Sequence, residues 1–174
     1  MRRLALLPLV MLVFACNDST LVQPESDLTI AAAARAGRTV LTWQETFDQS
    51  WDAGESFATP SGVLHLWGID NGFFVTGDLE GYSHVYGRCQ INLNSGKGAC
   101  SLTSSYAITE YLSQSVDGGF ECVGTSKLED FPVFTQYGRQ ECKGTGDFEG
   151  LRVKAETSNP IPGVGNYETT GEIW

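Results

Sequence analysis

Residues 73–93 read FFVTGDLEGYSHVYGRCQINL, and this stretch decides the fold. Apolar or small residues recur at every second position, and polar or amphipathic residues fill the positions between them. A period of two is typical of a β-strand with one buried face. A single strand of about twenty residues would be unusually long, so we expect a bend, bulge or turn at residues 77–81.

Similar segments occur on both sides of this stretch. Further strand candidates are residues 40–47, 63–69, 98–108, 119–127, 134–143, 149–156 and 167–173. Turn-forming residues separate them at 94–96, 117–119, 129–132, 144–146 and 159–165, whereas residues 44–60 fit a strand and a loop equally well.

The absence of helical periodicity sets the fold class. After Arg38 no apolar period of 3.6 residues lasts longer than two turns, while short strands and glycines are frequent. This pattern predicts an all-β, antiparallel sandwich or barrel. We favour a closed β-barrel of about eight strands, because closure removes exposed sheet edges.

The N-terminus has the pattern of a secretory signal. Arg2 and Arg3 precede an apolar run at residues 4–14, and Ala15 precedes Cys16; the run is too short to span a bilayer. Residues 13–16 also resemble a bacterial lipobox, which implies acylation of the Cys16 thiol. The alternative is a plain signal cleaved elsewhere. Because Asn17 stands where such lipoproteins retained in the inner membrane carry Asp, we expect the outer membrane of the cell envelope.

Composition divides the chain into three parts. Residues 1–15 form the predicted signal peptide, and residues 16–38 lack aromatic residues, which indicates a disordered, flexible tether. All four Trp, all six Tyr and eight of the nine Phe lie in residues 39–174, the predicted β-barrel domain. That length suffices for one hydrophobic core.

The charge balance restricts the partners. Without residues 1–15 the chain has 9 basic and 21 acidic residues, a formal charge of −12. Nucleic acid and anionic lipid headgroups require basic surface, so neither is expected to bind. The expected membrane contact is therefore the lipid on Cys16 alone.

Four cysteines in an exported domain indicate two disulfides, which allow three connectivities. Cys89 and Cys100 flank the turn at residues 94–96 almost symmetrically, and Cys122 and Cys142 flank the turn near Pro132 in the same way. Residues equidistant from a hairpin turn face each other, so we favour Cys89–Cys100 and Cys122–Cys142. A tetrathiolate metal site would need C-x-x-C pairs, which are absent, and we expect no metal or cofactor.

Titratable groups suggest no catalytic site, but aromatic residues suggest a binding site. His65 and His84 are the only histidines and belong to no metal or triad motif, and His84 falls on the polar face of its strand. We expect the aromatic residues Trp43, Phe47, Trp51, Phe57 and Trp67 to pack at one end of the barrel. Trp43, His65 and Trp67 are the candidate ligand-binding residues at that mouth.

Glycine and turn placement carries one resemblance. Residues 76–81 (TGDLEG), 144–152 (GTGDFEGLR) and 167–173 (YETTGEI) resemble the small bacterial β-barrels of unknown function grouped with allene oxide cyclase and dirigent proteins. The likeness covers residues 62–174 and implies a barrel; it transfers no catalytic residue.

Two functions follow as hypotheses. The first is a non-catalytic, lipid-anchored envelope protein that binds a small apolar ligand or another envelope protein. The second is an isomerase or cyclase-like enzyme acting on a hydrophobic substrate in the lumen, as the resemblance implies. A cavity of about 300 Å³ or more with convergent polar groups would favour a ligand carrier or an enzyme, and a filled barrel would favour a scaffold.

Overall fold

The computed structural model describes residues 37–133, 135–162 and 165–174. The strands are β1 (Thr39–Ala58), β2 (Val63–Gly77), β3 (Leu79–Asn92), β4 (Lys97–Tyr111), β5 (Gln114–Glu129), β6 (Thr135–Gly146), β7 (Arg152–Ser158) and β8 (Asn166–Ile173). Within these ranges no helix is long and apolar enough to cross a bilayer. The predicted signal peptide, Cys16 and the tether as far as residue 36 lie outside the described residues.

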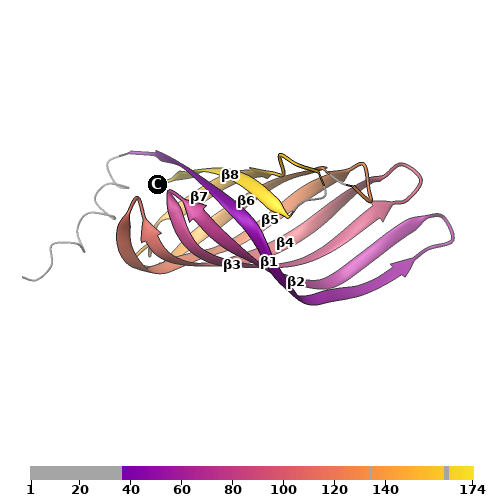
Figure 1. Ribbon diagram of the computed structural model, residues 1–174, viewed down its shortest axis with the longest axis horizontal. Coiled ribbons are helices and arrows are strands. Elements are labelled where there is room, and N and C mark those ends of the chain that lie inside the picture. The colour runs from indigo at the N-terminus through magenta and orange to yellow at the C-terminus, as the bar shows by residue number, and fades with distance from the viewer. Residues whose placement is uncertain (1–36, 134, 163–164) are drawn as a thin grey trace, which may run out of the picture.

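The strands form one closed antiparallel barrel (Figure 1). Each strand pairs with the next along the chain, and β8 pairs with β1 to close the ring, with Thr39 opposite Ile173. The prediction of an all-β, eight-stranded, closed antiparallel barrel is confirmed.

Residues 73–93 form the end of β2 and most of β3. The chain turns at Gly77 and Asp78, and the Asp78 carboxylate accepts a hydrogen bond of 2.7 Å from the Thr42 backbone N–H. The alternation predicted for this stretch is confirmed, because Val75 and Leu79 are buried while Phe74 is 51% exposed. Residues with the same parity therefore face the lumen on both sides of the turn.

Three boundaries differ from the prediction. The first strand continues through residues 44–58, which the sequence left open between strand and loop. Residues 117–119 lie inside β5, and the β4–β5 turn is made by Leu112 and Ser113, with φ of 49° and 64°. The β6–β7 turn lies at residues 147–150, after Gly146, so Glu149 is in the turn.

The end of the barrel where the C-terminus lies is closed by the β6–β7 turn. Phe148 from this turn is fully buried, with its ring centroid 4.7 Å from that of Phe120 and 5.6 Å from that of Tyr111. The prediction that the aromatic residues of β1 and β2 would pack together at one end is wrong. Trp51, Phe57 and Trp67 are 41–56% exposed, because strand pairing turns them to the outer face.

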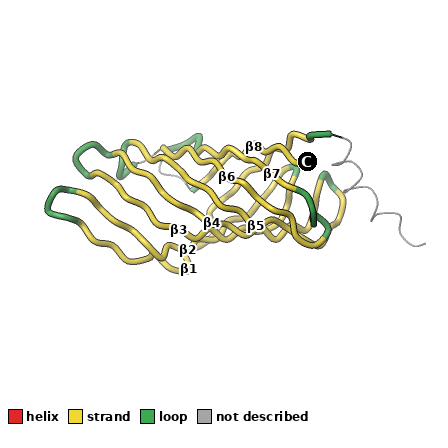
Figure 2. Tube along the Cα trace, turned by 180° about the vertical axis from the view of Figure 1, so that it is seen from behind, coloured by secondary structure: helices red, strands yellow, loops and turns green. Residues whose placement is uncertain are grey.

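At the other end, opposite the C-terminus, the pairing between β1 and β8 is interrupted. Pairing with β8 stops at Thr46, and the last backbone bond on this side is donated by the Phe47 N–H to the Gly165 carbonyl. Beyond it β1 pairs only with β2, and the β1–β2 hairpin projects from the barrel (Figures 1 and 2). We call this interruption the seam.

Both predicted disulfides are present. Cys89 lies directly opposite Cys100 on β3 and β4, and Cys122 lies opposite Cys142 on β5 and β6, each with a Cα–Cα distance of 4.0 Å. All four cysteines are buried on the inner face. The disulfides therefore connect neighbouring strands inside the lumen.

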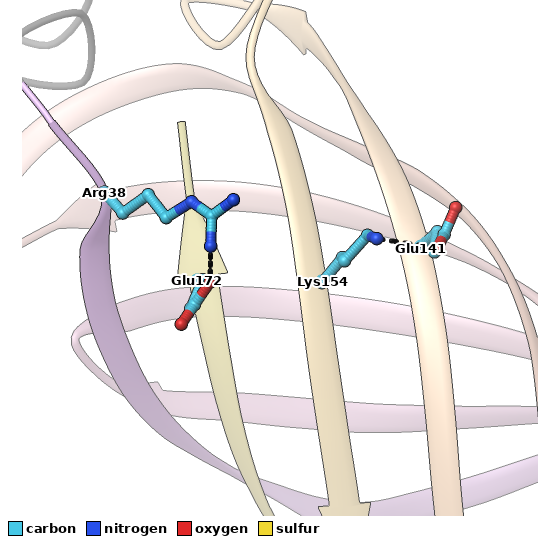
Figure 3. A network of polar contacts seen from close by, with 4 residues as sticks. All are labelled: Arg38, Glu141, Lys154 and Glu172. Atoms are coloured by element: carbon cyan, nitrogen blue, oxygen red, sulfur yellow. Dashed lines mark hydrogen bonds and ion pairs between the residues drawn. The ribbon is translucent and has the colours of Figure 1, made fainter.

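The outer face carries exposed ion pairs. Figure 3 shows Arg38 with Glu172 of β8, and Lys154 of β7 with Glu141 of β6, at N–O distances of 3.2 and 3.3 Å. Each of these side chains is at least 47% exposed, and surface pairs of this kind contribute about 0–1 kcal/mol. These ion pairs therefore contribute little to the stability of the barrel.

Candidate functional site

A cavity of about 230 Å³ lies inside the barrel. Its wall is mostly apolar: it is formed by Leu66, Ile69, Phe73, Val85, Ile91, Leu102, Leu128 and Phe131, with the Cys89–Cys100 disulfide. Pockets for drug-sized molecules begin at about 300 Å³, so this cavity suits a smaller molecule. Side chains therefore leave part of the lumen unfilled, but the space is small.

Glycines leave this space open. Gly87, Gly124 and Gly138, on three different strands, line the cavity. A Cβ atom added to Gly138 would lie 3.6 Å from its nearest neighbour, the Ser126 Cβ, which is an ordinary contact. Larger inward side chains at such positions would fill the lumen, as they do in most small barrels.

A buried carboxyl group forms the polar floor of the cavity. Glu45 of β1 is 5% exposed and lines the cavity. Its Oε1 accepts hydrogen bonds from the Tyr106 hydroxyl at 2.8 Å, the Trp43 indole N–H at 3.1 Å and the Thr169 hydroxyl at 3.3 Å. Its Oε2 accepts one from the Ser83 hydroxyl at 3.3 Å. This one side chain thus connects β1, β3, β4 and β8.

The network continues across the lumen to β6. The Gln140 amide donates to the Tyr106 hydroxyl at 2.8 Å, and the Gln140 carbonyl accepts from the Ser104 hydroxyl at 3.0 Å. Glu45, Tyr106, Gln140 and Ser104 all line the cavity. These four polar side chains therefore converge on one side of the cavity.

Burial changes the acidity of these groups. Burial raises the pKa of Glu45 above its ordinary 4.5, although hydrogen bonds from Tyr106, Trp43, Ser83 and Thr169 partly oppose the rise. The pKa of Tyr106 is raised well above 10 by burial and by the adjacent Glu45. Burial, with Glu45 nearby, raises the pKa of Tyr167 to about 12. Both tyrosines therefore keep their protons at neutral pH.

A second hydrogen-bonded set of polar side chains lies close to the seam. The Tyr167 hydroxyl donates to the Gln136 carbonyl at 3.3 Å, and the Gln136 amide donates to Ser126 at 3.1 Å. Tyr167 packs edge-on against Phe73, which in turn packs against the half-exposed Phe47. Aromatic side chains therefore lead from the surface at the seam to the cavity wall.

Of the three predicted ligand-binding residues, His65 and Trp67 line one pocket of β2, β3 and β4, and Trp43 lies apart from them. Trp43 is buried in the lumen, where it donates to Glu45. His65 and Trp67 alternate with the inward-packed Leu64 and Leu66 and therefore face outward, and the Trp67 indole donates to Glu55. A glycine bulge at Gly68 returns Ile69 to the inner face, so the strand parity changes after Trp67.

His84 lies on the outer face, as its alternation predicts. Its ring is 5.3–6.2 Å from the ring centroids of Trp51, Tyr82 and Tyr86, and its Nδ1 is 3.6 Å from the Asp70 Oδ1. The ring packing explains this histidine without a role in the lumen.

The polar floor was not predicted from the sequence. Glu45 shares the inward parity of Leu41 and Trp43, and an acid on an apolar strand face is a detectable signal. Its meaning depended on residues 44–60 being a strand. Gln140 and Tyr106 carry no comparable signal, because they join Glu45 only through barrel closure.

Within the described ranges, no group of three or more His, Cys, Asp or Glu residues could hold a metal ion. No protein-family model matches the chain, and a search of curated proteins finds no match. The cavity itself is therefore the main indication of function.

Proposed function

We propose that this chain is an exported, lipid-anchored envelope protein whose lumen binds a small, mostly apolar molecule. The observation that carries the proposal is the cavity of about 230 Å³, with an apolar wall and the polar floor of Glu45, Tyr106 and Gln140. Apolar walls with a few convergent polar groups are the usual composition of ligand sites. The lipid on Cys16, and with it the outer membrane, remains a prediction.

Gly138 provides the test. The substitution Gly138→Leu should fill the cavity without disturbing the strand, because a Cβ there meets only ordinary contacts. Native mass spectrometry of the protein extracted from its membrane should find a co-purifying small molecule, and the variant should lose it. The matched control is Tyr137→Leu, whose side chain on the same strand is 57% exposed. A ligand that survives Gly138→Leu, or none in either protein, would contradict lumen binding.

A second candidate is an isomerase or cyclase-like enzyme. The observation favouring it is a buried carboxyl with a raised pKa that faces a cavity beside a hydroxyl group, an arrangement suited to proton transfer. The resemblance to the allene oxide cyclase and dirigent group stays a prediction. Recovery of the bound molecule after incubation separates the candidates: an unchanged molecule supports a carrier. Conversion that Glu45→Gln abolishes supports an enzyme.

A further inference from the structure

The surroundings of Glu45 are arranged for a carboxylate. Its four hydrogen-bonding partners are Tyr106, Trp43, Ser83 and Thr169. An indole N–H can only donate, and the Tyr106 hydroxyl donates to Glu45 while it accepts from the Gln140 amide. A protonated Glu45 could donate its own O–H only to the hydroxyls of Ser83 or Thr169, each at 3.3 Å, because the two shortest contacts offer only donors.

Among the described residues that line the cavity, no basic side chain pairs with this carboxyl. Of the described residues that line the cavity, Arg139 is the one basic residue. Its guanidinium points outward, where its Nε lies 3.0 Å from the Glu156 Oε1, and its side chain is 82% exposed. A buried carboxylate without a paired cation is unfavourable, and the raised pKa of Glu45 reflects the cost of burying it. A positive charge within reach of Glu45 would remove it.

The remainder of the cavity is mostly apolar, although Asn71, Gln136 and Thr157 also line it. Leucine, isoleucine, phenylalanine and a disulfide line the wall above the polar floor. An apolar group fits this wall, and a single polar head fits the floor. The ligand is therefore amphipathic, with one end facing Glu45.

We infer that the ligand of the lumen is a small apolar amine whose protonated nitrogen pairs with Glu45. This inference deepens the proposed function and depends on it. An acid of the same size would meet the Glu45 charge, and Arg139, the one basic residue among the described lining residues, is directed outward to Glu156. A neutral alcohol could gain a hydrogen bond but no ion pair. If Glu45 serves only to join β1, β3, β4 and β8, it confers no preference for a cation.

The test uses three probes of matched size: 2-phenylethylamine, 2-phenylethanol and phenylacetate. Isothermal titration calorimetry with the full chain at pH 7 and low salt gives their dissociation constants. The amine should bind roughly tenfold or more tightly than the alcohol, as one partly buried charge pair provides. Phenylacetate should bind most weakly of the three.

Two variants locate the preference. Glu45→Gln keeps the size of the side chain and should abolish the advantage of the amine while leaving the alcohol within a few-fold. Glu141→Gln removes the same charge from the outer face, where the side chain is 71% exposed, and should leave the preference intact. If Glu45→Gln does not fold, the three probes are measured again with the unmodified protein at high salt, which screens exposed charges far more than buried ones. A preference for the amine that persists at high salt supports the inference, and one that disappears overturns it.

The outcomes separate the two proposals. An alcohol that binds as tightly as the amine would overturn the amine inference and leave lumen binding standing. A preference for the amine that survives Glu45→Gln would assign it to the acidic surface and would also overturn the inference. Failure of all three probes to bind would count against both proposals.

Discussion

At the scale of single residues, Glu45 is the most consequential side chain in the barrel. It accepts hydrogen bonds from side chains of β1, β3, β4 and β8, yet it is only 5% exposed, so bulk water solvates its charge poorly. Gly138 has the complementary role, because its missing side chain keeps the space above Glu45 open. One residue supplies the polarity of the cavity and the other supplies part of its volume.

The raised pKa of Glu45 makes stability depend on pH. In the unfolded chain Glu45 ionises near 4.5, whereas in the folded protein burial keeps the proton to higher pH. The unfolded state therefore loses this proton first, so the contribution of Glu45 to the free energy of unfolding decreases above pH 4.5. It levels off above the folded-state pKa, and each unit of pKa elevation amounts to about 1.4 kcal/mol.

Urea denaturation of the unmodified protein and Glu45→Gln across pH 4–8 measures this contribution. The difference between the two cancels the other acids, and the variant should gain relative stability as the pH rises above 4.5. A difference that stays flat across the range would contradict the burial argument. A constant offset alone would reflect only altered hydrogen bonds.

At the scale of elements, the β3–β4 and β5–β6 hairpins are each cross-linked on their inner face. The Cys89–Cys100 pair encloses a sequence separation of 11 residues and lines the cavity. The Cys122–Cys142 pair has a sequence separation of 20 residues and belongs to the hydrophobic core that contains Phe120 and Phe148. The two disulfides should therefore have similar effects on stability and different effects on binding.

Replacing either pair of cysteines by alanine should lower the free energy of unfolding by about 3 kcal/mol, with the 20-residue pair costing slightly more. Urea denaturation measures this loss. Only the Cys89→Ala, Cys100→Ala variant should change the affinity for 2-phenylethylamine, and Cys122→Ala, Cys142→Ala is its control. If both double variants changed the affinity equally, binding at the cavity lined by Cys89 and Cys100 would be contradicted.

At the scale of the whole molecule, the chain is acidic and the interior of the barrel is mostly apolar. Without residues 1–15 the chain carries a formal charge of −12, and the described ion pairs lie on the outer face. Such a surface is not suited to bind anionic membrane lipids. Membrane attachment should therefore depend on acylation at Cys16, which needs two or more lipid chains to be durable.

Cys16→Ser removes the thiol that acylation requires. In Triton X-114 phase separation, the unmodified protein should enter the detergent phase and the variant the aqueous phase. Both should retain the two disulfides, because those form between other cysteines. A variant that stays in the detergent phase would refute the lipid anchor.

The local features of the chain determined the fold class, most strands and both disulfides. Alternation and turn residues are local properties, and cysteines equidistant from a turn must face each other in an antiparallel hairpin. The β4–β5 turn escaped prediction because Leu112 and Ser113 are not residues that favour a positive φ, and the pairing of β4 with β5 imposes it. The outward placement of Trp67 escaped it because of a bulge at Gly68.

The candidate site was decided by tertiary structure. Glu45, Tyr106 and Gln140 are far apart along the chain, and only the curvature of the closed barrel brings β1, β4 and β6 to face each other across the lumen. The cavity likewise depends on three glycines from separate strands at neighbouring positions. Periodicity specifies which face of a strand is buried, but the volume between opposite walls depends on every strand at once.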